Sequence, residues 1–295
     1  EIIFMGSGTE ANNTALRSCD RPILVGATEH ASILKTAQRL GGDILTVDAF
    51  GLIDLASMES KLKALGRPAL VSVMLANNET AALPPSAQIA ALAKRYDAMV
   101  HCDAVQAIGK IPVDFGLLGV DMMTLCAHKA GGSVGMGVLV VRQNLALKPL
   151  LIGGGQELGR RAGTENVAAI VGFAQMFKTS TDWLASVDGW MRNLEADIIA
   201  CAPDTFIVGA AASRLANTSC ILMPNVNSET QLMTFDLEGI AVSAGSACTS
   251  GRIEASPVLT AMGISPQRAA CAIRVSAGWN TSENDILRFT EVWKK

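Results

Sequence analysis

The sequence predicts an α/β protein with a large domain on a mostly parallel sheet and a smaller α+β domain after it. From residue 1 to about residue 141, short apolar segments alternate with segments whose apolar residues recur at helical spacing. This alternation is typical of parallel strands joined by helices. The segment 69–75 is apolar without interruption, as in a strand buried on both faces. After about residue 180, a helical stretch is followed by short strand-like segments, so we divide the chain into a large domain, 1–180, and a small domain, 181–295.

The elements follow in order from these patterns. Each strand is an apolar run, and each helix has an apolar face, often ended by glycine as at Gly41-Gly42 and Gly66. We expect strands at 2–4, 22–25, 44–47, 69–75, 98–102, 120–125, 137–141, 205–208, 218–222 and 272–276. We expect helices at 11–16, 33–40, 55–65, 85–96, 167–177 and 183–199.

The composition excludes several classes of protein. The net charge of −3, with no run of Lys or Arg, argues against a nucleic-acid surface. No apolar stretch is long enough to span a bilayer. The seven cysteines have no CxxC spacing, so we expect no metal site and no disulfide framework, and a reducing, cytoplasmic setting. The chain opens on the strand-like residues 1–5, so we expect that an N-terminal segment is missing.

Five polar residues follow predicted strands: Thr9, His30, Asn78, Asp103 and Lys129. Ligands of parallel sheets bind beyond the carboxyl ends of the strands, so these side chains should converge on one rim. A lysine after a buried strand can be desolvated, which lowers its pKa and makes its amine a nucleophile. Such amines form Schiff bases with carbonyl substrates and with pyridoxal phosphate.

Each of these residues also has an ordinary structural interpretation. The turn before Thr9 can be an anion site or a plain helix cap. His30 and Asp103 can be capping residues. The small residues around Cys248 suggest a mobile loop that exposes the thiol, although a small buried cysteine is the alternative. Arg274 lies in an apolar strand and needs a carboxylate from the protein or from a substrate.

Together these segments resemble the pyridoxal-phosphate cysteine desulfurases of the NifS/IscS type, within the class V aminotransferases. The similarity extends over nearly the whole chain, in the family's order. The matching segments are 8–13, 28–30, 77–79, 101–106, 127–129, 153–157, 161–164, 243–250 and 273–276.

The resemblance implies fold type I of the pyridoxal-phosphate-dependent transferases and a role for each residue around the cofactor ring. Lys129 would hold the cofactor as a Schiff base and move protons at the substrate α-carbon. Asp103 would pair with the protonated pyridine nitrogen and keep the ring an electron sink. Gln106 would bond the ring hydroxyl, and His30 would stack on the ring and assist proton transfer.

The same resemblance implies a phosphate site and a homodimer. Gly8, Thr9 and His128 would hold the phosphate. Cys126 stands where the family usually has a serine or threonine that binds phosphate, and a thiol is a weaker donor. Thr164 would reach the phosphate of the neighbouring subunit.

The resemblance further implies the substrate site. Asn78, placed next to the cofactor, and Arg274 would fix the substrate carboxylate. Cys248 would attack the sulfur of L-cysteine, leaving alanine and a persulfide that passes to a sulfur acceptor, either an iron–sulfur scaffold or a thiolation enzyme. We expect no metal, nucleic acid or membrane partner.

Departures from the family pattern keep two alternatives open. Leu158 replaces a usual arginine, and the family's opening Asp-Asn-Asn-Ala-Thr-type stretch is absent. The chain could instead be another class V enzyme, such as a selenocysteine lyase or a plain aminotransferase. It could also be a non-catalytic homologue that acts as a partner protein.

Overall fold

The computed structural model describes residues 1–179, 181–244 and 255–295, which form two compact units. The first unit contains residues 1–46, 53–76 and 84–179. The second contains 47–52, 77–83 and the chain after Thr179. The two short segments from the first half therefore join the second unit, although the sequence pattern had placed them, and Asn78 with them, in the large domain.

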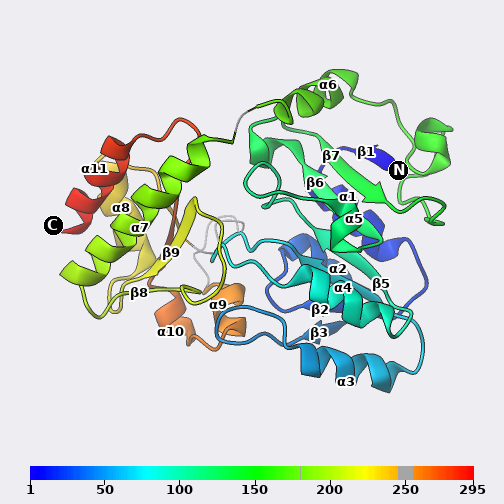
Figure 1. The fold of residues 1–295 in the computed structure, drawn as a ribbon, viewed down its shortest axis with the longest axis horizontal. Coiled ribbons are helices and arrows are strands. Elements are labelled where there is room, and N and C mark those ends of the chain that lie inside the picture. Colours follow the sequence, from blue (N-terminus) through cyan, green and yellow to red (C-terminus); the bar gives the residue numbers. More distant parts are fainter. Residues whose placement is uncertain (180, 245–254) are drawn as a thin grey trace. The chain divides into compact units, whose positions relative to one another are not determined.

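The first unit is built on a seven-stranded sheet in the order β1-β7-β6-β5-β4-β2-β3. The strands β2 to β6 run parallel, and β7 runs antiparallel to both β6 and β1 (Figure 1). The predicted mostly parallel sheet is confirmed. The strands are β1 (Ile2–Met5), β2 (Ile23–Gly26), β3 (Asp43–Leu45), β4 (Leu70–Met74), β5 (Met99–Asp103), β6 (Met122–Cys126) and β7 (Gly137–Val141).

Helices join these strands and bury their apolar residues against the sheet. Ile3 of β1, Ala15 of α1, Ile33 of α2 and Leu139 of β7 belong to one core cluster and are almost fully buried. Burial of the isoleucine and leucine side chains contributes about 1.5–3 kcal/mol each. The helices are α1 (Gly8–Arg17), α2 (Ala31–Arg39), α3 (Leu55–Leu65), α4 (Ser86–Lys94), α5 (Phe115–Leu118) and α6 (Val167–Met176), with short 3-10 helices at Ala127–Ala130 and Gln156–Gly159.

The second unit has a four-stranded antiparallel sheet in the order β10-β11-β9-β8. Alternate residues of β9 and β11 face opposite sides, as the period of two in a strand requires. Ile221 and Ile273 pack with α7, α8 and α11, whereas Cys220 and Leu222 pack with α9 and α10 (Figure 1). The elements are β8 (Phe206–Ile207), β9 (Thr218–Leu222), β10 (Ser243–Ala244), β11 (Ala272–Ser276), α7 (Trp183–Cys201), α8 (Ser228–Leu237), α9 (Pro257–Ala261), α10 (Pro266–Ala269) and α11 (Glu283–Trp293).

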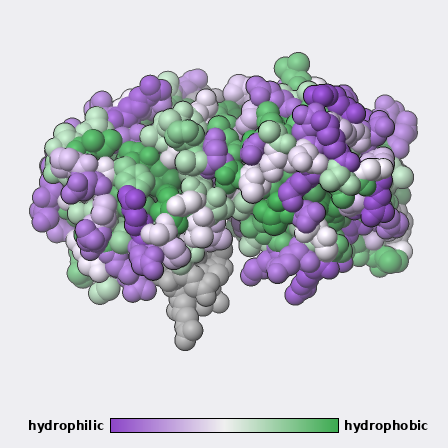
Figure 2. Space-filling view, turned by 90° about the horizontal axis from the view of Figure 1, so that it is seen from below, coloured by the Kyte–Doolittle hydropathy of each residue, from purple (hydrophilic) through white to green (hydrophobic). Residues whose placement is uncertain are grey.

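The surface mixes hydrophilic and hydrophobic residues over the face seen in Figure 2. None of the helices in the described part of the chain is both long and apolar enough to cross a membrane.

Candidate active site

Asp103 is the last residue of β5 and lies at the carboxyl end of the central parallel strands. Its side chain is buried, with 6% of the residue exposed. One carboxylate oxygen accepts a hydrogen bond from Asn12 Nδ2 at 2.7 Å, and the other accepts from the backbone N–H of Val105 at 3.0 Å. Among the described residues, no lysine or arginine forms an ion pair with Asp103. Asp103 therefore provides a buried acceptor that no lysine or arginine of the described residues neutralises.

Burial sets the electrostatics around this carboxylate. It raises the pKa of Asp103, while the hydrogen bonds from Val105 and Asn12 and the charge of His30 oppose the rise. Glu29, after β2, is fully buried too, and burial together with Asp103 raises its pKa well above the usual range. Glu29 Oε1 accepts from Met74 N–H at 2.7 Å, and Oε2 has no hydrogen-bond partner. Burial therefore disfavours the charged form of both carboxyl groups, but Asp103 accepts two hydrogen bonds and Glu29 only one.

His30 lies at the carboxyl end of β2, where it caps α2. Its Nδ1 accepts from the backbone N–H of Ser32 at 3.1 Å and lies 2.8 Å from Ser32 Oγ. Asn12 Nδ2 donates to the same hydroxyl at 2.9 Å. Because Nδ1 is occupied as an acceptor, the proton of the neutral imidazole belongs on Nε2. The capping interpretation of His30 is correct, and it leaves the Nε2 side of the ring available.

Lys129 follows β6 in the short 3-10 helix Ala127–Ala130. The expectation that it is desolvated is wrong, because Lys129 and His128 are both exposed. The strand ends at the buried Cys126, and the helical turn carries the next side chains beyond the sheet edge. Lys129 is nevertheless on the predicted rim, since β6 is the parallel neighbour of β5.

The start of α1 lies beside the end of β6. Ser7 caps the helix by accepting from Glu10 N–H at 3.1 Å, and Thr9 is exposed in the first turn. A Cβ on Gly8 would lie 3.2 Å from a Val105 methyl and 3.4 Å from Cys126 Cβ. Cys126 Sγ in turn lies 3.0 Å from His128 Nδ1. Backbone N–H groups at a helix start and the His128 imidazole are thereby brought together, which suits an anion.

Gln106 lies in the turn after β5 and is half-buried. Its side-chain oxygen accepts from Lys110 Nζ at 3.0 Å, so its amide N–H groups remain as the donors that a ring hydroxyl would need.

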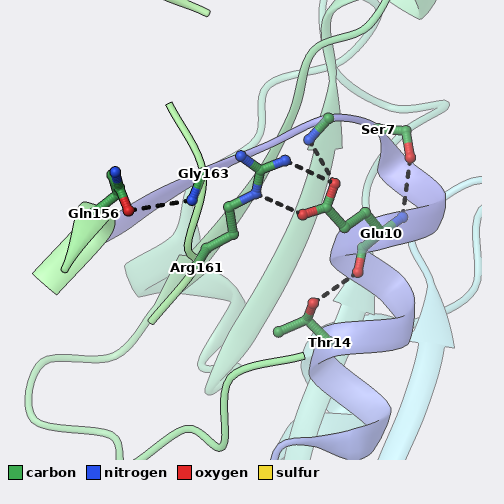
Figure 3. A network of polar contacts seen from close by, with 7 residues as sticks. Ser7, Glu10, Thr14, Gln156, Arg161 and Gly163 are labelled. Carbon is green, nitrogen blue, oxygen red and sulfur yellow. Dashed lines mark hydrogen bonds and ion pairs between the residues drawn. The ribbon is translucent and has the colours of Figure 1, made fainter. Parts of the chain in front are cut away.

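The polar loop before α6 is fastened to the start of α1 (Figure 3). Arg161 Nε donates to Glu10 Oε1 at 2.8 Å, and Glu10 Oε2 accepts from Gly6 N–H at 2.8 Å. Gln156 Oε1 accepts from Gly163 N–H at 3.2 Å. The next residue, Thr164, is exposed.

Asn78 and Arg274 lie together in the second unit. Arg274 Nη1 donates to the carbonyl oxygen of Asn78 at 2.7 Å. The adjacent Glu79 is buried, and its Oε2 accepts from Ser256 Oγ at 2.5 Å. Burial raises the pKa of Glu79 to about 7, opposed by Ser256 and by the charge of Arg274. Cys248 lies outside the described residues.

The first unit fits the pyridoxal phosphate that the sequence leads us to expect. A buried carboxylate without a cation suits a pyridinium nitrogen. Gly8 lets the α1 start approach Cys126 and Val105 closely, as a phosphate cradle requires. Lys129 follows the neighbouring strand. No described cluster of His, Cys, Asp and Glu side chains is suited to a metal ion.

Sequence reasoning assigned no role to Asn12, Glu29 or Ser32, which surround Asp103 and His30. Asn12 and Glu29 fall inside motifs that carried the resemblance, whereas Ser32 does not. The available signal was a polar residue on an apolar helix face, because Asn12 lies between the buried Ala11 and Ala15. Their partners depend on the three-dimensional fold.

Known proteins that are similar to this chain match it along almost its whole length. The sequence model of the aminotransferase class-V family matches residues 1–289. Cysteine desulfurase 2 of Trichormus variabilis is 39% identical over 300 residues, which cover 97% of this chain and 75% of that protein. Cysteine desulfurase NifS of Azotobacter vinelandii is 38% identical over 303 residues, 98% of this chain and 75% of that protein. The X-ray structure of a NifS-like protein from Rickettsia africae ESF-5 matches with a TM-score of 0.93 and 36% identity, over 100% of this chain and 81% of that one.

Proposed function

Because the chain belongs to the class-V aminotransferase family, we propose that it is a pyridoxal-phosphate-dependent cysteine desulfurase. The observation that carries the proposal is Asp103, a buried carboxylate at the carboxyl end of a central parallel strand with no lysine or arginine in an ion pair among the described residues. In this role Asp103 pairs with the pyridine nitrogen of the cofactor and keeps it protonated.

The other rim residues divide the remaining tasks. Lys129 would hold the cofactor through its aldehyde carbon and would serve as the base for the proton on the substrate α-carbon. His30 would lie over the ring and move a proton through Nε2, and Gln106 would donate to the ring hydroxyl. Pyridoxal phosphate, when bound, supplies a ring that stabilises negative charge at the α-carbon.

The phosphate is held at the junction of α1 and β6. Gly8 and Thr9 offer N–H groups, and Thr9 adds a hydroxyl donor. His128 and Cys126 contribute side chains from the end of β6. The Sγ of Cys126 also donates to the Met136 carbonyl oxygen at 3.4 Å, so its hydrogen is already shared with the backbone and is less available to the phosphate.

The substrate carboxylate is held by Asn78 and Arg274. Arg274 Nη1 donates a hydrogen bond to the Asn78 carbonyl oxygen. This bond orients the guanidinium and leaves its other N–H groups to bind a carboxylate.

Cys248 takes up the sulfur. Its thiolate attacks the thiol sulfur of L-cysteine, so a sulfur–sulfur bond forms as the bond from sulfur to Cβ breaks. The electron pair of the broken bond stays with Cβ, which takes a proton; Lys129 returns a proton to the α-carbon, and alanine is released. The persulfide on Cys248 then passes to a sulfur acceptor, an iron–sulfur scaffold or a thiolation enzyme.

The enzyme acts as a homodimer in which Thr164 reaches the phosphate of the partner subunit. Support comes from the surface around the anchored loop, because large apolar side chains are more than half exposed there. Such a patch on a protein of this size favours a partner. The exposed residues are Ile152, Leu158, Val167, Val171 and Phe177.

Product analysis tests the activity. With pyridoxal phosphate, L-cysteine and a thiol reductant, the wild-type protein should release alanine and sulfide in equal amounts, and Cys248→Ala should release neither. Formation of an α-keto acid that depends on an added amino acceptor would instead support an aminotransferase. A much higher kcat/KM for selenocysteine than for cysteine would support a selenocysteine lyase, and a wild-type protein without turnover would support a non-catalytic homologue.

A further inference from the structure

A chain of hydrogen bonds connects Asp103 and His30, the two residues of the first unit that are proposed to contact the cofactor ring. It begins at Asp103 Oδ2, which accepts from Asn12 Nδ2 at 2.7 Å. The same nitrogen donates to Ser32 Oγ at 2.9 Å, and Ser32 Oγ lies 2.8 Å from His30 Nδ1. The four residues come from β5, α1, α2 and the turn that precedes α2.

The direction of each bond follows from its partners. Both oxygens of the Asp103 carboxylate accept hydrogen bonds, so Asn12 presents its amide nitrogen to it. The second hydrogen on that nitrogen reaches Ser32 Oγ, which leaves the serine hydroxyl hydrogen for His30 Nδ1. The backbone N–H of Ser32 also donates to Nδ1, so this nitrogen is an acceptor on both counts.

The unpaired side-chain oxygen of Asn12 indicates which of its hydrogen bonds determine the orientation of the amide. Asn12 is 2% exposed, and its Oδ1 has no hydrogen-bond partner. A buried amide oxygen without a donor is unfavourable. Turning the amide would give Oδ1 a bond from Ser32 at best and would place it against the Asp103 carboxylate. The two bonds from Nδ2 therefore determine the orientation.

We propose that Asn12 and Ser32 are positioning residues of the reaction, forming a relay that holds the Asp103 carboxylate in place and fixes His30 with its proton on Nε2. The inference rests on the proposed function for its catalytic consequence, but the relay itself is a property of this chain. When Asn12 is lost, Asp103 keeps only the Val105 N–H as a hydrogen-bond donor. When Ser32 is lost, His30 keeps only the backbone N–H at Nδ1.

The direct test is nitrogen NMR of the histidine rings. The chain has three histidines, and His30→Gln assigns the resonances of His30. In the wild-type protein Nδ1 should be unprotonated and hydrogen-bonded, and Nε2 should carry the proton. In Ser32→Ala the Nδ1 resonance should move toward that of an imidazole nitrogen with fewer donors. A proton on Nδ1 in the wild-type protein would overturn the relay even if every variant failed to fold.

The kinetic test uses a control that breaks a comparable bond between the same helices. Thr36 Oγ1 on α2 donates to Asn13 Oδ1 on α1 at 2.9 Å, outside the relay. In Asn12→Leu, kcat should fall about 10- to 100-fold with little change in KM, the effect of losing one hydrogen bond to a charged group. Thr36→Val should retain wild-type kcat and the wild-type His30 resonances.

The outcomes separate the two proposals. Equal kcat in Asn12→Leu and Thr36→Val, with active wild-type protein, would contradict the relay alone. A wild-type protein that makes no alanine would contradict the proposed function, while the His30 resonances would still confirm or reject the relay.

Discussion

At the scale of single residues, two buried carboxyl groups, Asp103 and Glu79, have different electrostatic surroundings. Asp103 and Glu79 are both at least nine-tenths buried, but their surroundings differ. Asp103 has two donors and no ion pair among the described residues, whereas Glu79 has one hydroxyl donor and the nearby charge of Arg274. The first is suited to a cation from outside the chain, and the second titrates close to neutral pH.

Asp103→Asn tests the first of these carboxylates. The substitution keeps the size and one of the two hydrogen bonds from Asn12 and Val105, but removes the charge that holds a pyridine nitrogen protonated. We expect some cofactor to remain bound and kcat to fall by at least a hundredfold, because breaking a buried charge pair costs about 3–5 kcal/mol. The control is Asp121→Asn, another buried aspartate of the same unit, whose partners are Arg142 and Val100 N–H. Near-normal kcat in Asp103→Asn would restore Asp103 to a purely structural role.

Glu79→Gln tests the raised pKa of the Glu79 carboxyl group through the pH dependence of the free energy of unfolding. The folded-state pKa of Glu79, about 7, is above the ordinary value of 4.5, so folding favours the protonated form. Its contribution is fully present below pH 4.5 and is lost as the pH rises toward 7. Across that range the wild-type free energy of unfolding should lose up to about 3 kcal/mol through this group, and the glutamine variant should not.

Denaturant titrations at several pH values measure the difference. Glu283→Gln, an exposed carboxylate of the same unit, should follow the wild-type curve. Parallel curves for the wild-type protein and Glu79→Gln would show that Glu79 does not titrate in this range.

At the scale of elements, the junction between β1, α1 and β7 shapes the rim. Met5 pairs with Gly137 in the sheet, and a Cβ on Gly137 would lie 2.3 Å from the Ser7 carbonyl carbon and oxygen. These are backbone atoms of Ser7, the N-cap of α1, so they cannot move aside without displacing the helix start.

Gly137→Ala should therefore lower the free energy of unfolding by about 3 kcal/mol or more, in the range of severe overpacking, and weaken cofactor binding at the same time. Gly189→Ala is the matched control, because nothing lies within 4 Å of its Cβ position in the middle of α7. That change should be stabilising by about 0.5–1 kcal/mol. Equal stability of the two variants, measured by denaturant unfolding, would contradict the described packing.

Many elements could be predicted because their sequence signals are local. The strands from β1 to β7 are apolar runs between turns. The residues that follow each run can therefore be assigned to the rim from the sequence. The helices α5 and α8 to α11 were not predicted. In α8 the polar Glu229, Thr230 and Asp236 dilute the apolar face, and α9 and α10 are too short to show a period.

The finer geometry of the site depends on contacts between distant segments. The exposure of Lys129 follows from the helical turn after Cys126, which no apolar pattern reveals. The bond from Asn12 to Asp103 joins residues 91 positions apart. Sequence spacing can mark a polar residue in an apolar segment, but the side chains that it contacts depend on the three-dimensional fold.

At the scale of the whole molecule, the proposed homodimer predicts a defined oligomeric state. Sedimentation of the protein should show a dimer. Val171→Glu places a charge within the exposed apolar patch of α6 and should shift the protein to monomer, because an unpaired charge in an interface is strongly unfavourable. Leu237→Glu, at an even more exposed apolar position of the second unit, should remain dimeric. A monomeric wild-type protein that binds cofactor normally, unaffected by Thr164→Ala, would contradict the shared site.

The central claim is that the rim of the parallel sheet holds pyridoxal phosphate through Lys129, and borohydride trapping tests it most directly. The wild-type protein is incubated with the cofactor, reduced with borohydride, digested and analysed by mass spectrometry. We predict one reduced cofactor group per chain, attached to Lys129 in the peptide that follows β6, together with loss of the visible absorbance of the lysine-bound cofactor. Lys129→Ala should carry no group and have no turnover. Attachment at a different lysine, or alanine release by Lys129→Ala at the wild-type rate, would contradict the account.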